Sequence, residues 1–147
     1  MKTRWALSAL AAAATLTVAG CSSQPAEYDP PPGAVTAGTA QMTVNGQDAG
    51  TTQSVQCSTV GPLTTIETGN RESGVFAMIM AEDAQVVRIV RIQDLGGFTG
   101  SYNSGLGGEA NVAMIGRTFD LNGTAEGFET AEPSFRVPGS FQLKVSC

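Results

Sequence analysis

The sequence contains no histidine among its 147 residues. Histidine is the usual general base beside a nucleophilic serine or cysteine, and it is the commonest protein ligand of transition metals. Its absence excludes Ser-His-Asp and Cys-His catalysis, so the sequence predicts no catalytic residues, no metal site and no cofactor. The only adjacent carboxylates are Glu82 and Asp83, which would point to opposite faces of a strand. We therefore expect a protein that is not an enzyme.

Hydrophobic runs of membrane-spanning length are also missing. The N-terminal apolar stretch, residues 6–19, is shorter than the ~20 residues that a helix needs to cross the hydrocarbon core. It follows Lys2 and Arg4 and ends in Val18-Ala19-Gly20-Cys21. This pattern is typical of a lipoprotein signal peptide over residues 1–20, with lipid on the Cys21 sulfur. The alternatives are a membrane helix, for which the stretch is too short, and an ordinary secretory signal, which needs no cysteine there.

Positive charge is scarce in the expected mature chain, residues 21–147. Without Lys2 and Arg4, six basic and thirteen acidic residues remain, a formal net charge of −7. This balance argues against nucleic acid as a partner and against electrostatic docking on anionic lipid. We expect one domain, held by its covalent lipid at the cell membrane, on the extracytoplasmic face or the cell surface.

Two cysteines, Cys57 and Cys147, remain once Cys21 is assigned to lipid. No CxxC spacing and no histidine base support a redox or nucleophilic role. An even pair in an exported chain favours a disulfide. The bridge would close a loop of 91 residues and stabilise the fold by roughly 4–5 kcal/mol in the chain-entropy model.

Residues 21–40 have almost no apolar bulk and contain three consecutive prolines at positions 30–32. Such a segment cannot form a core, and the prolines favour an extended polyproline conformation at ~3.1 Å per residue. The sequence therefore predicts a Pro-rich flexible tether over residues 21–40, able to reach ~60 Å when extended. The β domain is expected over residues 41–147.

From residue 41 onward the chain consists of short apolar-polar alternations separated by glycine and asparagine. They predict strands at residues 42–44, 54–57, 63–68, 75–80, 98–102, 112–115, 118–124 and 140–147. Asn45-Gly46 is a tight-turn dipeptide. These features predict an all-β fold, an antiparallel sandwich or a partly open barrel with one disulfide, preceded by the signal peptide and the tether.

Residues 84–95 are ambiguous, because Arg88, Arg91 and Asp94 recur at a helical spacing of three. Five β-branched residues in the same segment favour a strand, and we predict a strand.

Residues 75–80 are continuously apolar, which suits a strand that is covered on both faces. Phe76, Met78 and Met80 are therefore candidate contacts for a hydrophobic ligand in a cavity between sheets. The simpler interpretation is that they pack in the core.

Several segments together resemble the mycobacterial lipoprotein antigen family of LpqH type. They are Val18-Ala19-Gly20-Cys21, Val44-Asn45-Gly46-Gln47-Asp48, Ser54-Val55-Gln56-Cys57 and residues 100–105, 120–127 and 140–147. The resemblance implies a mycobacterial envelope protein acylated on Cys21, a surface antigen that host innate lipoprotein receptors recognise. The Pro-rich tether departs from the Thr-dominated tether of the best-known type, so tether glycosylation is not carried over.

Two hypotheses for function follow. The first is a lipid-anchored, antigen-like surface protein with a non-catalytic binding or interaction role. The second is a carrier or transport accessory protein that holds a lipid or another hydrophobic ligand between its sheets. Ligand retained after purification would favour the carrier, and a filled interior would favour the first hypothesis.

Overall fold

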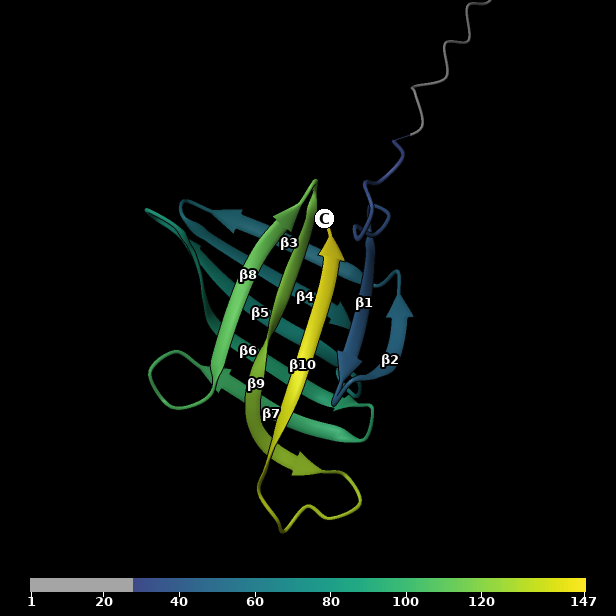
Figure 1. Ribbon diagram of the computed structural model, residues 1–147, viewed down its shortest axis with the longest axis vertical. Helices are drawn as coiled ribbons and strands as arrows, with labels where there is room; N and C mark the ends of the chain where they lie inside the picture. Colours follow the sequence, from purple (N-terminus) through teal and green to yellow (C-terminus); the bar gives the residue numbers. More distant parts are fainter. Residues whose placement is uncertain (1–27) are drawn as a thin grey trace, which may run out of the picture.

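Ten antiparallel strands and no helix form the part of the chain that the structure, a computed structural model, describes, residues 28–147 (Figure 1). They are β1 (Thr39–Val44), β2 (Gln47–Thr52), β3 (Val55–Val60), β4 (Leu63–Gly69), β5 (Gly74–Ala81), β6 (Gln85–Leu95), β7 (Phe98–Asn103), β8 (Glu109–Ile115), β9 (Thr118–Glu129) and β10 (Val137–Ser146). The expected signal peptide and Cys21 lie outside the described residues. Residues 28–147 contain no helix long and apolar enough to cross a bilayer.

The strands form one sheet that folds over itself into two layers. Its order is β2-β1-β10-β9-β7-β6-β5-β4-β3, and β8 also pairs with β9. Residues 118–124 of β9 pair with β8, whereas residues 126–129 pair with β7. Because β9 takes part in both layers, the strands of the two layers cross each other in Figure 1. The predicted all-β antiparallel fold is confirmed.

Glycines allow the long strand β9 to change layers. A Cβ atom at Gly123 would overlap the Glu109 carbonyl oxygen of β8, and one at Gly127 would overlap the Thr99 carbonyl oxygen of β7. Glycine in a strand marks such a close approach of neighbouring backbone. Strand β9 can therefore change its partner from β8 to β7 while its ladder with β10 remains continuous over residues 118–127.

The core lies between the layers and is filled by side chains from both. Leu121, Leu143 and Val145 enter it from one layer, and Ile66 and Val90 from the other, all with no exposed surface. Phe98 is 1% exposed, and its ring occupies the space that side chains at positions 100 and 139 would take, because both residues are glycine. Such close packing is what a stable interior requires.

The expected strands are present, and β2 is an additional one. Asn45 and Gly46 have positive φ angles of 51° and 76°, as the tight β1–β2 hairpin turn requires. The ambiguous segment 84–95 is strand β6, as predicted. Its register against β5 shifts between Met78 and Ile79, so a bulge interrupts the alternation.

Five apolar residues that the strand alternation of the sequence would place in the core lie elsewhere, among them Leu63, which is half-buried opposite Met80. Phe76, Met78 and Ile89 occupy the outer face of β5 and β6, because their neighbours along the strands alternate into the core. Met114, near the end of edge strand β8, is 43% exposed.

Candidate functional sites

The last part of the expected tether is docked on the domain. Residues 28–38, here called the strap, lie against the start of β9 and the turn between β8 and β9. The Val35 amide donates a hydrogen bond of 3.0 Å to Thr118 Oγ1, and Thr118 Oγ1 lies 3.4 Å from the Val35 carbonyl oxygen, to which it donates. Thr118 is 1% exposed, so the strap is bonded to a buried side chain.

A second set of contacts holds the beginning of the strap. The guanidinium carbon of Arg117 lies 5.1 Å from the centroid of the Tyr28 ring, within the range of a cation–π interaction. At Gly116, which has a φ of 59°, a Cβ atom would come within 2.7 Å of the Tyr28 hydroxyl and 3.1 Å of Pro31 Cγ. Glycine at this turn therefore serves both the backbone conformation and the packing of the strap.

The strap changes the expected extent of the tether. The Gly38 amide donates to the Ser146 carbonyl oxygen, so the strap continues directly into β1 beside the end of β10. The expected boundary at residue 41 is close to the observed start of β1 at Thr39. Sequence reasoning missed the docking because Tyr28, Pro31 and Val35 are too widely spaced to form an apolar pattern.

The disulfide between Cys57 and Cys147 is present as predicted, with a distance of 5.9 Å between the Cα atoms. Cys57 lies on the edge strand β3, and Cys147 directly follows β10. These strands are not hydrogen-bonded to each other, because β3 pairs with β4 at one end of the sheet order. The bridge therefore joins the two layers covalently near the strap.

The proposed ligand contacts Phe76, Met78 and Met80 point away from the space between the sheets. On β5 the buried residues are Val75, Ala77 and Ile79, and the three candidates alternate with them on the outer face, half-buried. Each lies directly opposite a residue of β6: Phe76 opposite Arg91, Met78 opposite Ile89 and Met80 opposite Val86. A site that uses these three side chains would be on the surface of the sheet.

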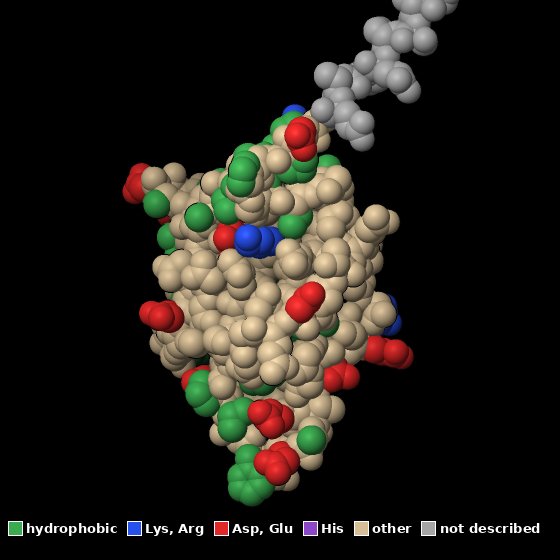
Figure 2. All heavy atoms as spheres, turned by 45° about the vertical axis from the view of Figure 1, so that its right-hand side comes forward, with side chains coloured by type: hydrophobic (Ala, Val, Ile, Leu, Met, Phe, Trp, Pro, Cys, Tyr) green, Lys and Arg blue, Asp and Glu red, His purple; other side chains and the backbone are tan. Residues whose placement is uncertain are grey.

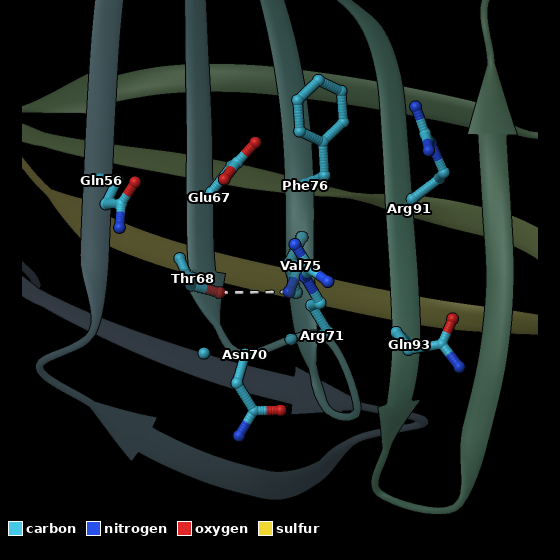
Figure 3. Close-up of a pocket in the computed structure, with 11 residues that line it drawn as sticks. Gln56, Glu67, Thr68, Asn70, Arg71, Val75, Phe76, Arg91 and Gln93 are labelled. Carbon is cyan, nitrogen blue, oxygen red and sulfur yellow. Dashed lines mark hydrogen bonds between the residues drawn. The ribbon is translucent and has the colours of Figure 1, made fainter.

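The outer face carries a pocket of about 540 Å³ around Phe76 (Figure 3). The guanidinium carbon of Arg91 lies 4.9 Å from the centroid of the Phe76 ring. Polar side chains from the three strands β3, β4 and β6 and from the β4–β5 turn complete the wall: Gln56, Glu67, Thr68, Asn70, Arg71 and Gln93. Met78 and Met80 do not line this pocket.

A second pocket of about 270 Å³ shares Arg91 and Gln93 with the first and extends it to Glu126 and Arg136. The two pockets together, here called the outer-face site, combine two aromatic residues, Phe76 and Phe128, with amide, guanidinium and carboxylate groups. Such groups suit non-covalent binding of a polar ligand. Nothing in the sequence indicated this site apart from Phe76, because the polar residues meet only through the strand register.

A third pocket opens between the layers, beside edge strand β2. Its volume is about 230 Å³, and its apolar lining includes Ala40, Met42, Leu95 and Leu143. Its polar lining consists of threonine side chains of β2 and of residues in the β4–β5 turn. This pocket, here called the inter-sheet groove, is where a hydrophobic ligand could contact the interior.

Metal ligands do not gather anywhere in the part of the chain that the structure describes. Residues 28–147 contain no group of three or more cysteine, aspartate, glutamate or histidine side chains that could hold a metal ion.

Comparisons with known proteins agree with the sequence motifs. The family model of the Mycobacterium 19 kDa lipoprotein antigen matches residues 33–147. A putative lipoprotein of Mycobacterium indicus pranii is 36% identical over 143 residues, which span 94% of this chain and 96% of that protein. A putative lipoprotein of Mycobacterium avium subsp. hominissuis is 31% identical over 137 residues, 92% of this chain and 90% of that protein. Lipoprotein LpqH of Mycobacterium tuberculosis is 31% identical over 108 residues, 73% of this chain and 68% of that protein.

Proposed function

Because this chain belongs to the Mycobacterium 19 kDa lipoprotein antigen family, we propose that it is anchored by acyl chains on Cys21 at the extracytoplasmic face of the cell membrane. Its β domain acts by non-catalytic binding. The observation that carries the anchoring is the sequence Val18-Ala19-Gly20-Cys21 after an uncharged apolar stretch. Two or more acyl chains make such an anchor stable, since each buried CH₂ contributes about 0.8 kcal/mol.

The similarity to other lipoproteins supports the anchor. The alignment with the Mycobacterium indicus pranii protein spans 94% of this chain, so it extends across Cys21 whichever end it omits. The N-terminus of the described domain also leaves the molecule at one end, where a lipid on a preceding residue would not obstruct the sheets (Figure 1).

The anchor is tested by comparing the wild-type protein with Cys21→Ala in a mycobacterial host. We expect the wild-type protein in the detergent phase of a membrane extract, with an intact mass that includes acyl groups and lacks residues 1–20. Cys21→Ala should leave the detergent phase and carry no acyl mass. Ser22→Ala, the matched control, should behave as wild type. Equal masses for wild type and Cys21→Ala, after allowance for the substitution, would refute acylation.

The outer-face site is the surface that best supports a binding role for the domain. It offers the Phe76 ring and the Arg91 guanidinium beside several hydrogen-bonding side chains. A binding partner is expected to lose affinity when Arg91 is replaced by alanine and to tolerate Gln41→Ala on the opposite layer, at the outer face of β1. Pull-down from envelope extracts with the two variants, followed by affinity measurement for any captured component, tests this role.

Host innate lipoprotein receptors are proposed partners of the acylated form, through the resemblance to the family. Recognition would depend on the lipid and not on the sheets. Receptor-reporter cells should therefore respond to the wild-type protein and lose the response with Cys21→Ala, while Arg91→Ala should leave it unchanged.

The inter-sheet groove supports a second function, a carrier of a small hydrophobic ligand. Its apolar lining, with Met42 and Leu143 buried in its wall, could contact a short stretch of acyl chain. An organic extract of the purified protein should then contain non-covalent lipid by mass spectrometry. Ala49→Leu, which fills the groove, should deplete that lipid, and an extract free of lipid from the wild-type protein would eliminate this function.

A further inference from the structure

We propose that the strap turns one end of the β domain toward the membrane, and that this end lies against the lipid headgroups. The inference rests on the proposed anchoring at Cys21. The end in question, here called the tether end, is formed by the strap and the adjacent β8–β9 turn, with the β3–β4 turn at the upper left of the same end in Figure 1.

The reach of the chain between anchor and domain limits how far the tether end can be from the bilayer. Seven peptide units separate Cys21 from Tyr28, where the strap contacts begin. At no more than about 3.6 Å per unit, they span at most about 25 Å. If the chain were free up to Thr39, eighteen units would reach about 65 Å on the same scale. Docking of the strap therefore removes more than half of the available reach.

The opposite end of the domain is displaced by more than this reach. The ten residues of β10 run between the two ends and span about 33 Å at ~3.3 Å per residue. The β9–β10 loop, which contains Phe135, lies beyond the start of β10 (Figure 1). Since the attachment point is at the tether end, the strap keeps this end nearer to the bilayer and directs the β9–β10 loop away from it.

The side chains exposed at the tether end suit contact with headgroups. Tyr28 is 45% exposed, Met114 43% and Val60 74%, and Figure 2 shows several hydrophobic side chains at the upper end of the molecule, besides those at its lower tip. Tyrosine in particular favours the membrane interface. These residues occupy three separate segments, and the fold brings them to one end.

The charged residues around this end are of both signs, so electrostatic attraction to anionic lipid would not by itself hold the end at the membrane. Arg117, beside Tyr28, carries a cation that could reach lipid phosphate. Asp29 on the strap, together with Glu82 and Asp83 in the β5–β6 turn, would oppose a strongly anionic surface. The partner is therefore the bilayer in which the lipid anchor is inserted. The anchor provides the attachment, and the contact with the tether end orients the domain.

The orientation can be measured because the only tryptophan, Trp5, is in the expected signal peptide. Met114→Trp places a single reporter at the tether end, and Phe135→Trp places one in the β9–β10 loop, where Phe135 is 67% exposed. Each lipidated mature protein, residues 21–147, is reconstituted in phosphatidylcholine vesicles that contain a dansyl-labelled lipid. Energy transfer to dansyl should be several-fold stronger from position 114 than from position 135. Equal transfer, or stronger transfer from position 135, would overturn the inference.

Vesicle flotation separates this result from the anchoring proposal. A protein that fails to float with the vesicles would refute the anchor, whereas a floating protein with equal transfer at both positions would refute only the orientation. Thr118→Val, which removes the hydrogen bonds to Val35, should reduce the difference between the two reporters. Thr43→Val, in the middle of β1 and away from the strap, is the control and should preserve the difference. A difference that survives Thr118→Val, with release of the strap confirmed by amide exchange at Val35, would show that the strap does not set the orientation.

Discussion

Replacement of both Cys57 and Cys147 with serine is expected to destabilise the β domain strongly. The bridge links residues 90 positions apart, on strands that have no hydrogen bonds with each other. In the chain-entropy model, a closed loop of this length restricts the unfolded chain by about 4–5 kcal/mol. Removal of the bridge should therefore lower the free energy of unfolding by most of that amount.

The structure also predicts which strand opens first when the disulfide is removed. β3 has only one partner strand, β4, and Cys57 itself is exposed on this edge. Cys147 is the last residue of the chain, and β10 before it is paired on both sides. Without the bridge, the amides of β3 should exchange with solvent sooner than those of β10, because edge strands open locally at lower cost.

Thermal and urea unfolding of the purified protein measure this effect. With a domain of this size, 4–5 kcal/mol corresponds to a fall of about 15–20 °C in the melting temperature. Reduction of the wild-type protein should reproduce the fall, and Thr59→Ser on the same strand should not. If the double-serine variant melted within a few degrees of the oxidised protein, the bridge would not be restraining the unfolded chain, and the reasoning would be refuted. Labelling of a thiol at either position in the oxidised, folded protein would refute the bridge itself.

Three further substitutions test the packing. Gly139→Ala places a Cβ atom 2.6 Å from Phe98 Cζ, so it should lower the free energy of unfolding by about 1–3 kcal/mol in urea titrations; an unchanged midpoint would contradict the contact. Thr118→Val should lower it by about 1–2 kcal/mol, and amide exchange at Val35 should rise at the same time, an effect that a purely local packing defect would not produce. Arg91→Ala should lower it by no more than about 1 kcal/mol, and a double-mutant cycle with Phe76→Leu should recover a coupling of similar size if the cation–π contact contributes.

The all-β class could be predicted because the strands carry local signals. Alternating residues in β10 and the β-branched residues of β6 favour extended backbone whatever their partners are. Asn45-Gly46 specifies a tight turn by its tolerance of positive φ. The disulfide followed from the number of cysteines, since Cys57 and Cys147 had no other chemistry available. The strand β2 (Gln47–Thr52) was missed because its sequence is polar and contains a glycine.

The faces of β6 could not be predicted, because a bulge in this strand sets them. Val87 and Val90 are three residues apart, yet both are buried against β5. The register shift opposite Met78 and Ile79 absorbs the extra residue and returns the alternation to the core. The spacing of three between buried residues of β6 is therefore a consequence of the bulge, although in the sequence alone such a spacing is typical of a helix. Phe76 lies on the outer face because β5 alternates without interruption, with Val75 and Ala77 directed into the core.

The strap shows a different limit of sequence reasoning. Polyproline segments lack backbone N–H donors and large apolar side chains, which are the features that predict packing. The sequence therefore predicted that residues 28–38 belong to a flexible tether. Their docking depends on a receptor that forms only when β8 and β9 are paired: the buried Thr118 hydroxyl, the Gly116 turn and the Arg117 guanidinium. None of these three residues is remarkable in the sequence. Since the receptor belongs to the folded domain, any change that opens the β8–β9 hairpin should also lengthen the tether, and so couple the stability of that hairpin to the distance between the domain and the membrane.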